Sequence, residues 1–340
     1  MGRKERLELI KKIETKRDSK VITYITGDRY GMQTAISTDI FPMFHKHLMQ
    51  IGKQKRIDLF IYSTGGITIA GYALVNLIRE FCDEFNVIIP FKALSCATLI
   101  SLGANKIIMT PMGQLSPIDP SITHPLGPKV QNQMQQIQIV PVNVEDVNAF
   151  VDLATKETNL KEEESLRKVF ELLGNTVHPL VLGAVQRSRA QIAFLAKQLM
   201  SRHISDEDVI KKVVQMLTRE LFSHDYVIGR REARETLKLP IEEPGQDDLG
   251  IYVKLFDEYS DLMKLTDPYN PEKTLGSKGE GEYQFYQAAI ESTHLTHVYK
   301  TSKFLRKISI QKPVGEGVTI PVSAHEERIL HQGWVQDEMV

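Results

Sequence analysis

The residues whose types and spacing could best carry out a reaction are Ser95 and the pair Gly65 and Gly66. The glycines follow the apolar run IDLFIY (57–62) and precede a segment with helical spacing. Ser95 opens the segment SCATLISLGA, after the apolar run 87–91 and the turn KAL. Glycine can adopt the backbone angles of a sharp turn, and the start of a helix points free N–H groups at whatever approaches it. Each position therefore predicts a sharp turn from a strand into a helix.

The spacing of these residues favours acyl transfer. Ser95 lies 29 residues after Gly66, close to the roughly 30 residues of one right-handed βαβ unit, so both turns should lie beside each other at one edge of a sheet. Attack of a hydroxyl on a carbonyl develops negative charge on the carbonyl oxygen, and one well-aimed donor is worth on the order of 10²–10³ in rate. The simpler alternatives are that Ser95 only caps a helix and that the glycines only form a tight turn.

Other chemistries have weaker support in the sequence. The chain lacks the GK[ST] of a P-loop and the GxGxxG of a dinucleotide site. Cys96 is a potential nucleophile, yet a cysteine among alanines and leucines is more often a small buried apolar residue. His294 and His297 lie three apart on a predicted strand, so they should point to opposite faces and make a poor metal pair. We expect neither a metal nor a cofactor.

The segments around these residues alternate between short apolar runs and longer amphipathic ones, which is typical of βαβ units and a parallel sheet. Amphipathic spacing predicts one helix from Ser37 or Asp39 to a stop at Gly52, and another over 67–85. The predicted strands are VITYIT (21–26), IDLFIY (57–62), VIIPF (87–91) and KIIMT (106–110).

Beyond Pro128 the pattern changes to three long helical segments, followed by a short strand and a small helix within HDYVIGRREARETLKLPI. The helical segments are 144–173, 178–202 and 205–222. A polar, glycine-rich stretch (270–285) is typical of a linker, and THVYKTSKFLRKISI alternates like a β-hairpin. We expect a domain over 1–269, with its core at 20–128 and 222–245 and a helical insertion at 144–222, followed by a linker and hairpin tail at 270–340.

Composition sets outer limits on function. The 340 residues are 42% apolar and carry 42 basic and 43 acidic side chains, so no bulk positive field favours nucleic acid or an anionic membrane. Cys82 and Cys96 cannot build a disulfide framework or a thiolate zinc site. The charged N-terminal segment and the absence of a run of about 18 apolar residues predict a cytoplasmic protein without membrane insertion or nucleic-acid partners.

Several motifs resemble a known family. YSTGGITIAG resembles the glycine-pair segment of the Clp proteases, and KALSCATLISLGANKIIM resembles the nucleophile segment of the same superfamily, which includes the signal peptide peptidase A type. VITYITGDR, LVNLIREFCDE, SPIDPS, HPLVLGAVQRSRAQI and HDYVIGRREA are together similar to the SDH-type (serine dehydrogenase proteinase) serine proteinases, from about residue 20 to about residue 240. The resemblance implies an α/β fold with the Clp/crotonase-like ββα-superhelix core, a mostly parallel sheet, a helical extension and a small C-terminal β-hairpin.

The same resemblance implies roles for site residues. Ser95 would be the nucleophile, Gly65 and Gly66 the oxyanion turn, and the amide of Cys96 a second donor. Related sequences carry alanine and glycine after the serine, whereas Cys96 and Ala97 follow it here. Where Clp proteases place their histidine, about 25 residues beyond the serine, this chain has Asp119.

A carboxylate at its ordinary pKa is a poor base toward serine, so the base must come from elsewhere. We expect His178 in this role, oriented by Asp119. The alternatives are His124, His224 and, for a serine–lysine pair, Lys129 or Lys197.

We therefore expect a homo-oligomeric serine peptidase that forms an acyl-enzyme on Ser95 and acts on polypeptides. One alternative is a catalytically silent Clp-fold interaction module, because the altered neighbours of Ser95 and the missing histidine are what loss of chemistry would leave. Another is a crotonase-like acyl-coenzyme A enzyme, although the sequence lacks an obvious basic cluster for the adenine and phosphates.

Overall fold

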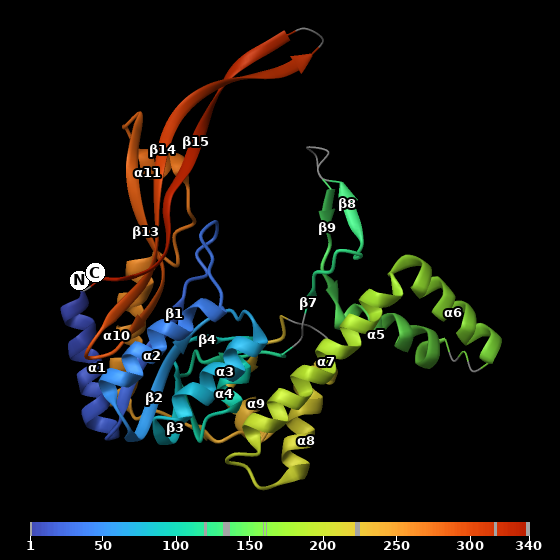
Figure 1. Cartoon of the computed structure of the whole chain (residues 1–340), viewed down its shortest axis with the longest axis horizontal. Coiled ribbons are helices and arrows are strands. Elements are labelled where there is room, and N and C mark those ends of the chain that lie inside the picture. Colours follow the sequence, from blue (N-terminus) through green and yellow to red (C-terminus); the bar gives the residue numbers. More distant parts are fainter. Residues whose placement is uncertain are drawn as a thin grey trace. The chain divides into compact units, whose positions relative to one another are not determined.

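An eight-stranded mixed sheet organises the part of the chain that carries Ser95 (Figure 1). The structure is a computed structural model, and it describes residues 2–118, 121–131, 137–158, 160, 162–221, 225–315 and 318–337. The strand order is β12-β5-β3-β2-β1-β13-β14-β15. The bounds are β1 Lys20–Thr26, β2 Gln54–Tyr62, β3 Cys82–Ile89, β5 Lys106–Met109, β12 Ile241–Glu242, β13 Glu280–Glu291, β14 Thr296–Gly315 and β15 Val318–Gln336.

The first five strands in this order pair in parallel, and β13, β14 and β15 add to β1 as antiparallel strands. The apolar runs of the sequence lie in the parallel part, where residues of β1, β2 and β3 are buried on both faces. Burial on both faces is typical of a parallel sheet covered by helices. The predicted α/β class with a mostly parallel sheet is confirmed.

Helices pack on this sheet with their apolar faces inward. Gly52 ends α2 with φ 70, as the sequence predicts. The helix predicted over 67–85 is shorter, because α3 ends at Arg79 and β3 already begins at Cys82, so that Phe85 is buried in the sheet. The bounds are α1 Arg3–Arg17, α2 Phe41–Ile51 after a 3-10 turn at Thr38–Ile40, α3 Thr68–Arg79, α4 Cys96–Leu102, α10 Gln246–Met263 and α11 Pro271–Leu275.

The sequence did not predict α1, whose composition is strongly charged. Its apolar side chains Leu9, Ile10 and Ile13 nevertheless join a core cluster with Tyr259 of α10. Arg6 of the same helix is 1% exposed. Its charge is neutralised by Glu291 of β13, with Nε to Oε2 at 2.7 Å and Nη2 to Oε1 at 3.0 Å. A bidentate pair of this kind lets a charged residue occupy a core position.

The C-terminal segment extends the sheet. Within the expected linker 270–285, residues Pro271–Leu275 form α11 and β13 begins at Glu280. The chain divides into one compact unit of 1–114 with 240–340 and a second of 115–239. The sequence-based boundary at residue 269 differs from this division. Residues on both sides of that boundary lie in one unit, because β13 pairs with β1. The hairpin is also larger than expected: β14 pairs with β13 only as far as Arg306, and beyond it β14 pairs with β15 alone.

The second unit is mainly helical. The helical pattern predicted over 144–173 is divided into α5, a π-helical turn at Leu153–Glu157, and α6. Two short strand pairs precede it, β7 with β10 and β8 with β9. The bounds are β7 Ser121–Ile122, β8 Lys129–Gln131, β9 Ile137–Ile139, β10 Val142–Asn143, α5 Val144–Asp152, α6 Glu163–Thr176, α7 Pro179–Met200, α8 Glu207–Gln215, a π-helical turn Met216–Glu220, β11 Ile228–Gly229 and α9 Arg230–Glu235. The short β4 (Lys92–Ala93) belongs to the first unit, and β6 is Gln114–Leu115. Across the described ranges of both units, no helix is both long enough and apolar enough to cross a membrane.

Candidate active site

The turn after β2 and the turn before α4 lie side by side. Ser63 N donates to Lys92 O of β4 at 2.9 Å, and Leu94 N donates back to Ser63 O at 3.0 Å. This isolated parallel bridge between Ser63 and Ala93 joins the two segments directly before Gly65 and Ser95. The carboxyl ends of two parallel strands therefore bring the glycine pair and the serine to one edge of the sheet.

Gly65 contacts Ser95 so closely that a side chain would not fit between them. Gly65 has φ +119, and a Cβ built on it would lie 2.8 Å from Ser95 Cβ and 3.3 Å from Ser95 Oγ. Its own N–H donates to Ser63 Oγ at 3.0 Å. The amide of Gly65 is therefore already used, and Gly65 serves the site by its lack of a side chain.

Gly66 is held by the loop segment at Ile36. Ile36 N donates to Gly65 O at 2.8 Å, and Ile67 N donates to Ile36 O at 2.8 Å. A Cβ at Gly66, where φ is +149, would lie 2.2 Å from Ile36 O. The Gly65–Gly66 peptide bond is trans, so its N–H points away from Ile36, opposite to the Gly65 carbonyl. Among the described residues, no acceptor binds this N–H, and Gly66 is exposed.

Ser95 has an unusual backbone. Its φ is 50 and its ψ is −112, outside the regions that residues with a side chain ordinarily adopt. Ser95 occupies the N-cap position of α4, yet its side chain makes no capping hydrogen bond, and the residue is half-buried. A conformation of this kind costs on the order of 1–3 kcal/mol and is typical of functional sites. The simple capping interpretation therefore does not describe Ser95.

The side chain of Cys96 is buried and packs against α3 and the segment before it. Its Sγ lies 3.2 Å from Ile67 O, and burial raises the pKa of the thiol to about 12. Gly71 of α3 makes room for it, because a Cβ there would lie 2.5 Å from the sulfur. The thiol is thus a poor nucleophile. The backbone N–H of Cys96, in the first turn of α4, has no acceptor among the described residues.

Buried polar residues that the sequence analysis missed support the two turns. Thr26 Oγ1 donates to Ser63 Oγ at 2.7 Å, which orients the acceptor of the Gly65 amide. The position of Ser63 directly before Thr-Gly-Gly, at the end of an apolar strand, was the signal available in the sequence.

An ion pair fixes the neighbouring strand. Lys92 Nζ lies 2.7 Å from Asp28 Oδ2, and Tyr62 OH donates to Asp28 Oδ1 at 2.7 Å. Burial is the main cause that raises the pKa of Tyr62, and its hydrogen bond to Asp28 adds to it. These contacts tie the loop after β1 to β2 and β4, and so hold the segment that leads to Ser95.

The candidate bases all belong to the unit 115–239. His178 is exposed and caps α7, with Nδ1 accepting from Leu180 N at 3.2 Å. His124 Nδ1 accepts from Leu126 N at 3.2 Å in the same way. Lys129 of β8 and Lys197 of α7 are exposed. Asp119 and His224 lie outside the described residues.

The hydrogen bond to His178 has a chemical consequence. A neutral imidazole that accepts at Nδ1 carries its proton on Nε2, so Nε2 acts as a donor in this tautomer. In the conformation described, His178 would therefore have to release the α7 N-terminus or change tautomer before it could accept a proton at Nε2. Within the described ranges, no group of three His, Cys, Asp or Glu side chains is arranged to hold a metal ion.

The chain is similar to proteins of known sequence and to solved structures. Two uncharacterised proteins of Methanocaldococcus jannaschii are 23% identical over 259 residues (74% of this chain and 79% of theirs) and 29% identical over 126 residues (35% and 42%). Two solved structures of a membrane-bound stomatin-specific protease also match. One is a lysine-to-alanine mutant in complex with a substrate peptide, with TM-score 0.37 and 13% identity over 68% of this chain and 78% of that one. The other is a serine-to-alanine mutant, with TM-score 0.33 and 12% identity over 68% and 83%.

The family model of the ClpP-like SDH-type serine proteinases matches residues 2–179, which is more than half of the chain. The matched range contains β1, β2, β3 and both turns at the edge of the sheet. The chain therefore belongs to the ClpP-like SDH-type serine proteinase family.

Proposed function

We propose that the protein is a serine peptidase that forms an acyl-enzyme on Ser95 and stabilises the oxyanion with the backbone N–H groups of Gly66 and Cys96. Membership of a serine proteinase family supports the reaction class. The observation that carries the residue assignment is the contact between Gly65 and Ser95, which sets a half-buried hydroxyl of unusual backbone geometry beside a turn with an unused amide.

The reaction follows from these groups. Ser95 Oγ forms a bond to the carbonyl carbon of the peptide as its proton passes to the base, and the carbonyl oxygen becomes an anion. The N–H groups of Gly66 and Cys96 donate hydrogen bonds to this oxygen, and these bonds are strongest when its negative charge develops in the transition state. The C–N bond then breaks, the amine leaves with the proton of the base, and water hydrolyses the ester on Ser95.

For the base we propose His178, oriented by Asp119, with His124, His224, Lys129 and Lys197 as the alternatives. The pH dependence of the rate of Ser95 acylation distinguishes a histidine base from a lysine base. With a histidine base the rate should rise around the ordinary histidine pKa of about 6.5, and with a lysine base it should rise at much higher pH. Loss of the low-pH inflection in His178→Gln, with retention in His124→Gln, is the expected result. An unchanged profile in His178→Gln would exclude His178.

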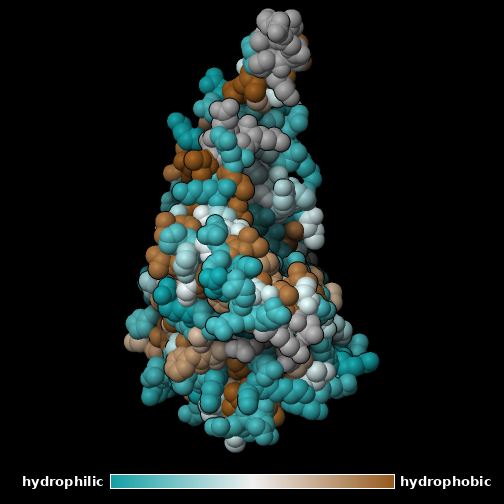
Figure 2. Space-filling view, turned by 90° about the vertical axis from the view of Figure 1, so that its right-hand side faces the viewer, coloured by the Kyte–Doolittle hydropathy of each residue, from teal (hydrophilic) through white to brown (hydrophobic). Residues whose placement is uncertain are grey.

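We also propose that the protein is a cytoplasmic homo-oligomer acting on polypeptides. Figure 2 shows apolar residues exposed among hydrophilic ones on one face of the molecule. On α6 and α7, the side chains of Phe170, Leu172, Leu180 and Phe194 are between 57% and 65% exposed, so these helices offer apolar area that contacts with further copies would cover.

A fluorophosphonate probe tests the central assignment, because it forms a stable covalent bond with an activated serine. We expect labelling of the wild-type protein at Ser95, located by peptide mass spectrometry, and none in Ser95→Ala. Ser201→Ala, which removes an exposed hydroxyl at the end of α7, is the matched control and should label normally. Equal labelling of Ser95→Ala and wild type, or no labelling at any concentration of the protein, would contradict the proposal and favour a catalytically silent module.

A further inference from the structure

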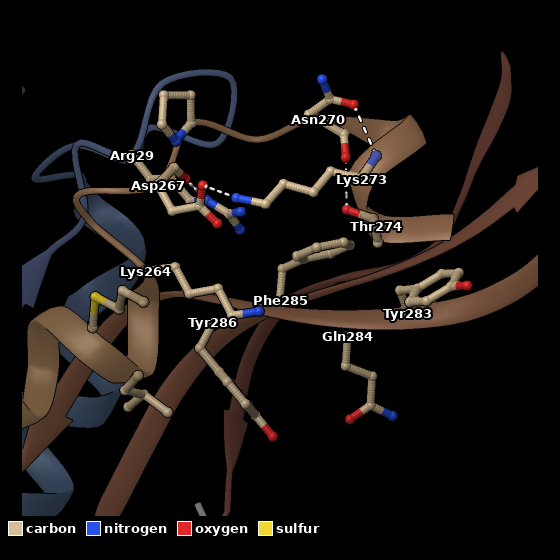
Figure 3. Close-up of a pocket in the computed structure, with 13 residues that line it drawn as sticks. Arg29, Lys264, Asp267, Asn270, Lys273, Thr274, Tyr283, Gln284, Phe285 and Tyr286 are labelled. Atoms are coloured by element: carbon tan, nitrogen blue, oxygen red, sulfur yellow. Dashed lines mark hydrogen bonds and ion pairs between the residues drawn. The ribbon is translucent and has the colours of Figure 1, made fainter. Parts of the chain in front are cut away.

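A cavity of about 490 Å³ lies in the unit formed by 1–114 and 240–340 (Figure 3). The loop after β1, the end of α10, α11 and β13 form its walls, and none of Ser95, Gly65 and Gly66 lines it. Its volume is within the range of sites for small organic ligands. The lining residues that matter below are Arg29, Lys264, Asp267, Lys273, Phe285 and Tyr286.

Arg29 is the fixed positive charge of this cavity. The residue is 7% exposed, and its Nε donates to the carbonyl oxygen of Asp267 at 2.7 Å. Its guanidinium carbon lies 5.7 Å from the ring centre of Tyr269 and 5.9 Å from that of Phe285. Among the described residues, Arg29 forms no ion pair with a carboxylate. Because a buried charge without a counter-charge is unfavourable, the cavity favours an anion near this guanidinium.

The other charged side chains keep the cavity positive. Asp267 is the one carboxylate among the residues that line it, and it already pairs with Lys273, with Nζ to Oδ1 at 2.7 Å. This hydrogen bond is the main cause that lowers the pKa of Asp267, and the charges of Lys273, Arg29 and Lys264 act in the same direction. Once Asp267 and Lys273 neutralise each other, the charges of Arg29 and Lys264 remain.

Lys264 occupies a backbone position that glycine would adopt more readily. It follows α10 with φ 53 and ψ 48, the left-handed conformation at the end of a helix. Figure 3 shows its side chain extending from the end of α10 toward β13, near Phe285 and Tyr286. A lysine in this position is unfavourable for folding compared with glycine, so the requirements of folding do not explain this residue.

We propose that this cavity binds a small organic oxyanion, a phosphate monoester or a carboxylate, between Arg29 and Lys264, with the organic part against Phe285 and Tyr286. The two uncompensated positive charges match the two negative charges of a phosphate monoester better than the single charge of a carboxylate. Guanidinium groups also bind phosphate and carboxylate oxygens in a bidentate manner, which gives Arg29 the main share of recognition.

Isothermal titration calorimetry of the full chain tests the proposal with phenyl phosphate, benzoate and the neutral benzamide. We expect phenyl phosphate to bind more tightly than benzoate, benzamide not to bind, and the affinity for phenyl phosphate to fall as NaCl is raised to 0.5 M, because salt screens partly exposed charges. Tighter binding of benzoate would identify a carboxylate ligand, and equal binding of benzamide would contradict an anion site.

The variant Lys264→Gly separates binding from folding. It should lower the affinity for phenyl phosphate at least about tenfold, as expected for loss of a hydrogen bond to a charged group. It should also raise the melting temperature of the protein, because glycine adopts the left-handed conformation without strain. Arg29→Gln should weaken binding further. Lys254→Gln, which removes an exposed charge of the same helix outside the cavity, is the control and should leave both quantities unchanged. Unaltered phenyl phosphate affinity in Lys264→Gly, or no binding by the wild-type chain, would overturn the proposal.

Discussion

At the scale of single residues, the site depends on two kinds of restricted position. Gly65 and Gly66 have positive φ values and approach Ser95 and Ile36 too closely to carry a side chain. Ser95 has a side chain but also a positive φ. The segment before it is held to the neighbouring turn by the hydrogen bonds between Ser63 and Lys92 and between Leu94 and Ser63.

The first prediction concerns Gly65→Ala. The added Cβ would lie 2.8 Å from Ser95 Cβ, so the serine must move away from the turn. Fluorophosphonate labelling should then fall at least about 100-fold, because the displaced hydroxyl is no longer aligned with the proposed donor of Gly66. Gly183→Ala in α7, where the added Cβ meets nothing within 4 Å, is the control. It should label normally and should raise the free energy of unfolding by about 0.5–1 kcal/mol, since alanine favours helix. Normal labelling of Gly65→Ala would exclude the proposed geometry.

The second prediction concerns Cys96. Because burial raises the pKa of its thiol to about 12, Cys96 in the native protein should react very slowly with a thiol reagent such as dithionitrobenzoate at pH 8. In urea, where the protein is unfolded, Cys96 should react rapidly. Cys82 is half-buried, so the measurement is made in Cys82→Ala. Rapid reaction of the folded Cys82→Ala variant would show that Cys96 is accessible and would reopen its role as a nucleophile.

At the scale of elements, long-range polar contacts fix helices whose own sequences do not predict their positions. The clearest case is α1, where the side chain of Arg6 reaches Glu291, and Glu291 also accepts hydrogen bonds from Tyr259 of α10 and Thr296 of β14. One carboxylate thereby joins a helix of the N-terminal segment to the C-terminal strands of the sheet.

The third prediction follows from this contact. Arg6→Ala would leave Glu291 buried without its partner, and the free energy of unfolding in urea should fall by about 3–5 kcal/mol. Lys12→Ala, at an exposed position of the same helix, should change it by less than about 0.5 kcal/mol. A similar small effect of both substitutions would mean that α1 contributes little to the stability of the sheet.

At the scale of the whole molecule, a buried histidine makes stability depend on pH. His47 of α2 is fully buried, with Nδ1 2.8 Å from Ser292 Oγ and Nε2 3.0 Å from His297 Nδ1. Burial, and then the charges of His297 and His294, lower the pKa of His47 to about 3. The folded protein therefore keeps this imidazole neutral, whereas the unfolded chain takes up a proton near pH 6.5.

The fourth prediction is the resulting loss of stability in acid. Between pH 6.5 and pH 3 the unfolded state binds the additional proton, so the free energy of unfolding should fall by up to about 1.4 kcal/mol per pH unit from this group alone. His47→Gln should show a shallower dependence in urea titrations at several pH values, and the exposed His45→Gln should match the wild type. An identical pH dependence of His47→Gln and wild type would exclude His47 as the source.

The sequence by itself determined the parallel strands, the helix that ends at Gly52 and the meeting of the Gly65 and Ser95 turns. These features depend on local periodicity, on glycine conformations and on the nearly fixed length of a βαβ unit, all of which can be read within about 30 residues. The end of α3 was predicted too late, since an apolar stretch near a boundary satisfies a helix and a strand equally well.

Only the tertiary structure decided the burial of α1, the addition of β13, β14 and β15 to the sheet, and the hydrogen bond that occupies the amide of Gly65. Arg6 and Glu291 are 285 positions apart, and Ser63 is given its role by Thr26 on the neighbouring strand. Such contacts depend on which surfaces meet when the chain folds. No local pattern records that information, because the same charged or polar residue would be an ordinary solvated side chain without its distant partner.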